Sequence, residues 1–212
     1  MEKVLVAGAN GTTGRIIIDR LKGHNNYTPV AMIRKEEQQA AFEKMGVDTV
    51  LQDLENDLTD VTQGMDKVIF AAGSGADTSE DKTVAVDQEG AIKLIEDASK
   101  HGVRKFVMLS SMGADNPESH EKLRHYLEAK KKADDHLAGK QMNFSIVRPG
   151  MLTNDTGSGM IKIGKKLGEQ GKIPREDVAA TLVTALEDQK LSRQKVEILS
   201  GDKNIDSALD SI

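Results

Sequence analysis

The chain has 212 residues, of which 38% are hydrophobic, so it is long enough for one sizeable core and is most simply a single domain over residues 1–212. Its formal net charge of −5 argues against electrostatic nucleic-acid binding, and its lack of cysteine excludes disulfides, thiol catalysis and thiolate metal sites. No apolar run approaches the roughly 18 residues of a membrane span. We therefore expect a cytoplasmic protein with neither a nucleic-acid nor a membrane partner.

Short apolar runs alternate along the chain with longer segments of helical period. Runs such as V-L-V-A and F-V-M-L are apolar throughout, as expected for strands covered on both faces. Strands are predicted at residues 3–7, 29–34, 49–52, 67–71, 105–110, 143–148 and 195–199. Helices are predicted at 14–22, 36–45, 83–101, 120–138 and 175–188, with a short turn near 58–63. This order predicts an α/β fold of three layers, with a mostly parallel, doubly wound sheet of about seven strands.

A glycine-rich stretch over residues 151–175 is the least regular part of the chain. It is too rich in glycine for a confident helix prediction. We expect an irregular loop region on the substrate side, as part of a minimal C-terminal substrate region. A mobile flap over a ligand and an ordinary surface loop with a short hairpin are the two alternatives.

Histidines do not suggest a metal centre in this sequence. The five of them form neither an H-x-x-x-H nor an H-E-x-x-H pair. A G-x-S-x-G nucleophile motif is also absent. No metal is therefore predicted.

Glycines follow the first predicted strand in the run A-G-A-N-G-T-T-G-R. Such glycines permit a tight turn, and they let backbone N–H groups and the start of a helix approach a diphosphate. Strand, loop and helix stand in the order of a Rossmann dinucleotide-binding unit, although Asn10 occupies the position of the middle glycine in G-x-G-x-x-G. The predicted phosphate-binding residues are Gly8, Asn10, Gly11, Thr12, Thr13 and Gly14.

Arg34 follows the second predicted strand, 20 residues beyond Gly14. An NAD-preferring fold would place an acidic residue there for the ribose 2′-hydroxyl. A guanidinium can instead clamp a 2′-phosphate, so the sequence favours NADP (NADPH) over NAD. The alternative is a solvated strand end whose charge is balanced by Glu36 and Glu37.

Seven motifs follow one another along nearly the whole chain: G-A-N-G-T-T-G, Q-D-L, F-A-A-G, V-M-L-S-S, Y-L-E-A-K, V-R-P-G and R-E-D-V-A-A. In this order they resemble the short-chain dehydrogenase/reductase superfamily. More narrowly, they are similar to its small atypical branch of NmrA-like and biliverdin-reductase-B-like NAD(P)-binding proteins. The resemblance implies an oxidoreductase that binds a nicotinamide cofactor and a small-molecule substrate.

The same resemblance implies positions for the cofactor. Asp53 and Leu54 would border the adenine, and Ala71, Ala72 and Gly73 would line the ribose and phosphate path. Arg148, Pro149 and Gly150 would lie beside the nicotinamide. For Asp53, a helix cap or a plain surface carboxylate is an equal alternative.

The resemblance also implies a catalytic set. Tyr126 would supply a proton during hydride transfer, Lys130 would hold the nicotinamide ribose and favour the tyrosinate, and Ser110 or Ser111 would orient the carbonyl. Hydride addition to a carbonyl builds alkoxide charge, which a well-placed O–H donor relieves. The sequence does not distinguish the two serines, and each is as well explained as the end of a strand.

A helical projection of residues 120–138 supports the tyrosine and lysine pair. Tyr126 and Lys130 share an apolar stripe, and Lys130 lies near its centre, where a lysine needs a partner. The candidates are Asp134, one turn on, and the ribose hydroxyls of a bound dinucleotide, which we favour. His125 projects off this face, so we do not expect it to relay protons.

Three functions follow from these patterns. The first is an NADP-dependent reductase of a small carbonyl or quinone-like substrate, and the second is a non-catalytic NADP-binding redox sensor that signals to a protein partner. The third is an NAD(P)-dependent epimerase or isomerase. Only 62 residues follow Gly150, fewer than the substrate lobe of larger epimerase-like relatives, which disfavours sugar-nucleotide substrates. The helical faces would also suit a homo-oligomer.

Overall fold

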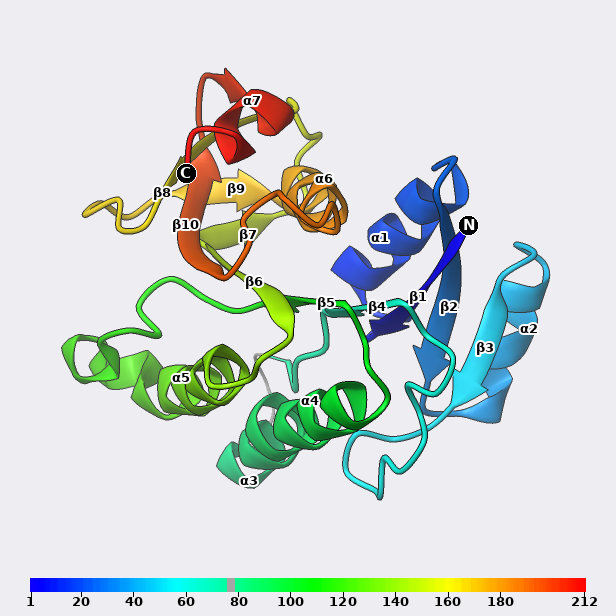
Figure 1. Cartoon of the computed structure of the whole chain (residues 1–212). Coiled ribbons are helices and arrows are strands. Elements are labelled where there is room, and N and C mark those ends of the chain that lie inside the picture. Colours follow the sequence, from blue (N-terminus) through cyan, green and yellow to red (C-terminus); the bar gives the residue numbers. More distant parts are fainter. Residues whose placement is uncertain (76–78) are drawn as a thin grey trace.

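A nine-stranded sheet forms the centre of the computed structural model, which describes residues 1–75 and 79–212 (Figure 1). Its strands are β1 (Glu2–Ala7), β2 (Tyr27–Ile33), β3 (Asp48–Leu51), β4 (Lys67–Phe70), β5 (Lys105–Leu109), β6 (Asn143–Pro149), β8 (Met160–Gly164), β10 (Gln194–Ser200) and β11 (Lys203–Asn204). They lie in the order β11-β8-β10-β6-β5-β4-β1-β2-β3. Neighbours from β10 to β3 run parallel, whereas β8 is antiparallel to both β10 and β11.

Helices cover both faces of this sheet. They are α1 (Thr12–Lys22), α2 (Gln39–Glu43), α3 (Glu80–Thr83), α4 (Ala91–Lys100), α5 (Arg124–Ala138), α6 (Arg175–Thr184) and α7 (Ile205–Leu209). Helices α1, α2, α6 and α7 pack on one face, and α4 and α5 on the other (Figure 1). Residues Val84–Gly90, between α3 and α4, form a π-helix. Within the described residues, no helix combines the length and apolarity needed to cross a membrane.

The layers follow from the apolar pattern of the strands. In β1, Val4 and Val6 face one hydrophobic cluster while Leu5 faces the other, and all three are fully buried. This alternation places helices on both sides of the sheet. Ile17 and Leu21 of α1 are fully buried against the first cluster, and burial of each such side chain stabilises the fold by roughly 1.5–3 kcal/mol.

The predicted α/β class is confirmed, and each of the seven predicted strands exists, but the sheet contains more strands than expected. The expected irregular loop over residues 151–175 is wrong in part. This region holds β8 and also β7 (Met151–Thr153) and β9 (Lys172–Pro174), which pair in parallel as a separate two-stranded sheet. Strand β8 contains two isoleucines and one glycine, Gly164, and it obtains its backbone hydrogen bonds from β10 and β11.

The parallel strands deliver several chain segments to one edge of the sheet. Ala7, the last residue of β1, pairs with Phe70, the last of β4, and Phe70 pairs with Met108 near the end of β5. The loops that follow these strands carry the predicted cofactor and catalytic residues. Ligands of doubly wound sheets bind outside the carboxyl ends of the strands, so this edge is where the site is sought.

Candidate functional site

Two pockets open at the carboxyl ends of the strands. The smaller has a volume of about 280 Å³, and the larger about 620 Å³. They share Gly11 and the segment 71–73, so they adjoin at the glycine loop. A third pocket of about 490 Å³, lined by residues 187–192, 194, 209–210 and 212, contains none of the predicted site residues.

Most of the predicted site residues line one or both of the two adjoining pockets. The smaller pocket is lined by Gly8, Asn10, Gly11, Arg34, Asp53, Leu54, Ala71, Ala72 and Gly73. The larger is lined by Gly11, Thr12, Thr13, Ala71, Ala72, Gly73, Ser110, Tyr126 and Lys130. The pockets therefore bring together residues from six separate segments of the chain.

Close backbone approach explains the glycine loop. Gly8 has φ +84°, and a Cβ atom there would lie 2.6 Å from the Ala72 backbone. A Cβ atom on Gly14 would lie 2.1 Å from the Gly8 carbonyl oxygen, so Gly14 packs α1 against the loop and does not line either pocket. Gly11 is the N-cap of α1 and supplies no side-chain cap. The first N–H groups of α1 are thus left for an anion.

Arg34 is exposed at the rim of the smaller pocket. Its backbone N–H donates to Gln38 Oε1 at 3.1 Å, and Gln38 lines the same pocket. Within the described part of the chain, no carboxylate lies within 4.0 Å of the Arg34 guanidinium, so neither Glu36 nor Glu37 balances its charge. The guanidinium is therefore free for an anionic ligand.

Asp53 combines a position in the smaller pocket with a local turn contact. It lines the smaller pocket, and its Oδ1 atom accepts a hydrogen bond from the Glu55 backbone N–H at 3.1 Å. The second contact is a local turn cap. A side chain engaged in such a turn can still present its other oxygen to the pocket.

Lys130 is almost fully buried and forms an ion pair that the sequence did not identify. Its Nζ atom lies 2.8 Å from Asp87 Oδ1, and Asp87 is fully buried in the π-helix. Burial lowers the pKa of Lys130, but the charge and hydrogen bond of Asp87, together with Tyr126 and Asp134, more than offset burial, so the pKa lies above its ordinary value. Asp87 lies on the same face of the predicted helix as Thr83 and Ala91. An aspartate on that face was the signal in the sequence that could have identified the partner of Lys130.

Asp87 also reaches the nucleotide side of the pocket. Its Oδ2 atom accepts a hydrogen bond from the Ser74 backbone N–H at 2.8 Å. A Cβ atom added to Gly73, the preceding residue, would lie 3.3 Å from Asp87 Oδ1, so this residue packs closely against the carboxylate. One carboxylate thus joins Lys130 to the loop that follows β4.

A second buried network engages one of the two candidate serines. Ser110 Oγ donates to Asp134 Oδ2 at 2.8 Å, and Arg148 Nε donates to the same oxygen at 2.9 Å. Burial raises the pKa of Asp134, while Arg148 and Ser110 partly offset that effect. Asp134 is therefore the partner of Arg148 and Ser110, whereas the ion-pair partner of Lys130 is Asp87.

Four predicted residues besides Gly14 lie outside the lining of both pockets: Ser111, Arg148, Pro149 and Gly150. Ser111 Oγ donates to the Met112 carbonyl oxygen at 3.2 Å. The Arg148 guanidinium is buried beside Asp134. Gly150 packs against Leu199, where an added Cβ atom would lie 2.4 Å from a methyl carbon.

Tyr126 is half-buried and lines the larger pocket together with Lys130. Lys130 Nζ lies 5.7 Å from the centre of the tyrosine ring. His125, which we expected to project away, lines this pocket as well, and its Nε2 atom lies 3.0 Å from the Glu80 carbonyl oxygen. The contact with α3 turns His125 toward the pocket.

Arg175, the first residue of α6, also lines the larger pocket. The sequence marked it only as part of R-E-D-V-A-A and assigned it no role. Its position directly after Pro174, at the predicted start of a helix, was the signal in the sequence that could have identified Arg175 as a site residue.

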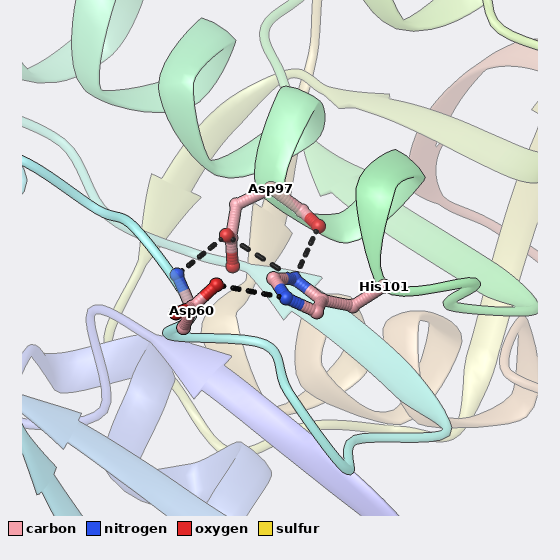
Figure 2. Close-up of side chains that lie close together, drawn as sticks. All are labelled: Asp60, Asp97 and His101. Carbon is pink, nitrogen blue, oxygen red and sulfur yellow. Dashed lines mark hydrogen bonds and ion pairs between the residues drawn. The ribbon is translucent and has the colours of Figure 1, made fainter.

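Another polar cluster lies away from both pockets. Figure 2 shows Asp60, Asp97 and His101 turned toward one another, with His101 Nε2 3.0 Å from Asp60 Oδ1. Both carboxylate oxygens of Asp97 already accept backbone N–H groups, from Asp60 at 2.8 Å and Thr62 at 2.7 Å. Lys100 Nζ lies 2.9 Å from Asp60 Oδ1 and balances part of the negative charge. The cluster therefore ties the turn near residue 60 to α4.

Comparison with known proteins agrees with this geometry. The family model for NAD(P)H-binding proteins matches residues 8–189. The uncharacterized sugar epimerase YhfK of Bacillus subtilis (strain 168) is 38% identical over 211 residues, covering 98% of each chain. Among solved structures, a candidate NAD-dependent epimerase/dehydratase from Bacillus halodurans is 38% identical, covers 100% of both chains and has a TM-score of 0.95. The oxidoreductase ylbE from Lactococcus lactis is 28% identical, with 99% of this chain and 96% of that chain covered and a TM-score of 0.85.

The glycine loop yields a matched pair of substitutions. Gly14→Ala should destabilise the fold by about 3 kcal/mol or more, because the new methyl group meets the Gly8 carbonyl. Gly11→Ala should cost under about 1 kcal/mol, since Gly11 has φ −72°, yet it should weaken nucleotide binding at the shared wall of the pockets. Urea denaturation and nucleotide titration measure the two effects. Equal stability of the two variants would contradict this assignment.

The buried ion pair predicts a strong coupling. Asp87→Asn should destabilise the protein by roughly 3–5 kcal/mol, because it leaves the Lys130 ammonium buried without a counter-charge. The double variant Asp87→Asn/Lys130→Met should recover most of that loss, since no unpaired charge remains. Urea denaturation of the wild type, both single variants and the double variant gives the coupling energy. Independent, additive losses would show that the pair is not coupled.

Proposed function

The chain belongs to the family of NAD(P)H-binding proteins, and from that premise we propose that it is an NADP-dependent oxidoreductase that transfers hydride to a small carbonyl or quinone-like substrate. One observation carries the proposal. Tyr126 and Lys130 line an open pocket of about 620 Å³ that adjoins the glycine loop. A pocket of this size has room for a nicotinamide ring and a small substrate beside the tyrosine.

The two adjoining pockets suit the two halves of the dinucleotide. The smaller would hold the adenosine, between Arg34 and Leu54, and the larger would hold the nicotinamide. The diphosphate would lie against the uncapped start of α1. The adenosine, the diphosphate and the nicotinamide would then each contact a different part of the two adjoining pockets.

The catalytic role in this proposal rests with α5. A bound reduced nicotinamide would supply the hydride, and Tyr126 would donate a proton to the oxygen that gains negative charge. The Lys130 ammonium, 5.7 Å from the tyrosine ring, stabilises the tyrosinate that remains. Asp87 holds this ammonium in place through the buried ion pair.

Ser110 has a narrower role in the proposal than the resemblance implied. Its hydroxyl proton is engaged by Asp134 at 2.8 Å, so the hydroxyl faces the larger pocket as an acceptor. Tyr126 is then the main donor to a substrate carbonyl. Ser110 and Arg148 instead both bond to Asp134 Oδ2 beneath the site.

The preference for NADP over NAD is supported by Arg34. Its guanidinium stands at the rim of the smaller pocket without an acidic partner among the described residues. A 2′-phosphate would supply the missing negative charge. Lys82 lines the same pocket but is already paired with Glu55.

An NAD(P)-dependent epimerase is the second candidate, because the two relatives that are 38% identical carry epimerase names. Transient oxidation and re-reduction would use the same Tyr126 and Lys130. The two functions differ in their net consumption of cofactor. A reductase consumes NADPH in proportion to product, whereas an epimerase returns the cofactor unchanged.

Arg34 supplies the test of cofactor preference. Arg34→Ala should raise the NADPH dissociation constant about 10- to 100-fold, because a charge-assisted hydrogen bond to the 2′-phosphate is lost. The NADH constant should change less than about twofold. Fluorescence titration of both nucleotides measures the ratio, and an equal change for NADPH and NADH would refute the 2′-phosphate contact.

Tyr126 supplies the test of proton donation. Tyr126→Phe should lower kcat by about 100-fold or more for NADPH oxidation against a panel of aldehydes, ketones and quinones, while NADPH binding stays near wild type. Tyr27→Phe is the matched control, because Tyr27 lies in the core of the same protein and lines neither pocket. A Tyr126→Phe enzyme as fast as wild type would exclude Tyr126 as the donor.

A further inference from the structure

Arg175 occupies a part of the larger pocket to which the proposed reaction gives no role. It begins α6, directly after Pro174, and its side chain is half-buried. Tyr126, Lys130 and Leu152 line the same pocket. The guanidinium is therefore presented to the space in which substrate and nicotinamide would meet.

The charge of Arg175 is not balanced by the protein. Its Nη1 atom donates to the neutral amide oxygen of Asn154 at 2.8 Å. Over residues 1–75 and 79–212, no carboxylate lies within 4.0 Å of the guanidinium. A partly buried cation with a neutral partner favours the approach of an anion.

The two acidic residues next to Arg175 are engaged elsewhere. Glu176 Oε2 accepts the Gly157 N–H at 2.8 Å, and Asp177 Oδ1 accepts the Gly159 N–H at 2.7 Å. Both carboxylates hold the loop that precedes β8. Their use as backbone acceptors directs both carboxylates toward the loop and away from the Arg175 guanidinium.

The rest of the lining does not supply the missing negative charge. Lys130 is already neutralised by Asp87, and Lys122 adds a further positive charge at the exposed rim. Glu80 is the acidic side chain of the lining, and its carboxylate lies 3.9 Å from His125 Nδ1. The net charge of the side chains that line this pocket is positive, and a positive charge attracts anions.

We propose that Arg175, oriented by Asn154, binds an anionic oxygen group within the larger pocket. The ligand chemistry is a carboxylate or phosphate, which accepts two parallel hydrogen bonds from a guanidinium. This inference rests on the proposed function, because that function supplies the two sources of such a group. One is an acid group of the substrate, and the other is the diphosphate of the nucleotide.

The lining also suggests the shape of an acid that would fit. Leu109, Leu152 and the ring of Tyr126 provide apolar walls near the guanidinium. An aromatic acid would place its ring against these walls and its carboxylate on Arg175. Benzoate is therefore a suitable probe, and benzamide is its neutral counterpart of nearly equal shape.

The test compares Arg175→Gln and Arg175→Lys with wild type. Arg20→Gln is the matched control, because it removes the same charge from an exposed position of α1 that lines neither pocket. The first arm titrates each protein with NADPH and with adenosine 2′,5′-bisphosphate, which lacks the diphosphate bridge and the nicotinamide. The second arm titrates the NADP-saturated protein with benzoate and benzamide by calorimetry.

If the substrate is the source, wild type should bind benzoate at least tenfold more tightly than benzamide, and Arg175→Gln should lose this preference while NADPH binding stays unchanged. If the diphosphate is the source, Arg175→Gln should weaken NADPH at least tenfold, with little effect on adenosine 2′,5′-bisphosphate. A tenfold change corresponds to about 1.4 kcal/mol. Arg175→Lys should retain part of the binding in either arm, and Arg20→Gln all of it.

The proposal is overturned if Arg175→Gln binds both NADPH and benzoate within twofold of wild type. It is also overturned if Arg20→Gln shows the same loss, because the effect would then reflect net charge alone. Failure of the proposed function looks different: wild type itself would not bind NADPH. In that case the benzoate and benzamide titrations are performed on the free protein, where loss of the preference in Arg175→Gln still supports the anion site and its absence in wild type rejects it.

Discussion

Two buried ion pairs beneath the larger pocket hold this site together. Asp87 neutralises Lys130, and Asp134 receives both Ser110 and Arg148. A buried charge is tolerated only when it is paired and hydrogen-bonded, so each pair restricts where its helix can lie. The first pair joins the π-helix to α5, and the second joins α5 to the ends of β5 and β6. Tyr126, on the same helix, takes its position from both.

The sequence predicted the parts of the fold that depend on local pattern. The apolar runs located the parallel strands, and the spacing of Gly8, Gly11 and Gly14 located the tight turn between β1 and α1. Strand β8 was missed because the glycines around it obscured its short apolar pattern, and because its pairing partner β10 lies some 30 residues later. The partner of Lys130 was missed for the same kind of reason: Asp87 lies 43 positions earlier, and only the packing of two helices brings them together.

The structure was also needed to show which of the two candidate serines faces the larger pocket. Ser110 and Ser111 are equivalent in sequence, yet successive side chains at a strand end point in opposite directions. Ser110 thus reaches Asp134 and the larger pocket, whereas Ser111 bonds to the Met112 carbonyl. Arg148 was placed beside the nicotinamide by resemblance, but the buried carboxylate of Asp134 holds its guanidinium below the pocket floor.

The loop before β8 is held differently from the glycine loop that follows β1. Backbone contacts of Gly8 and Gly14 leave no space for side chains at these two positions. Near residues 157–159, two carboxylates from α6 accept hydrogen bonds from backbone N–H groups, which every residue except proline provides. The loop is nevertheless restricted in its side chains, because a Cβ atom on Gly157 would lie 2.7 Å from Asp177 Oδ1 and Gly159 has φ +72°. A change in the first turn of α6 would therefore also alter the loop at residues 157–159, since Glu176 and Asp177 join the two segments.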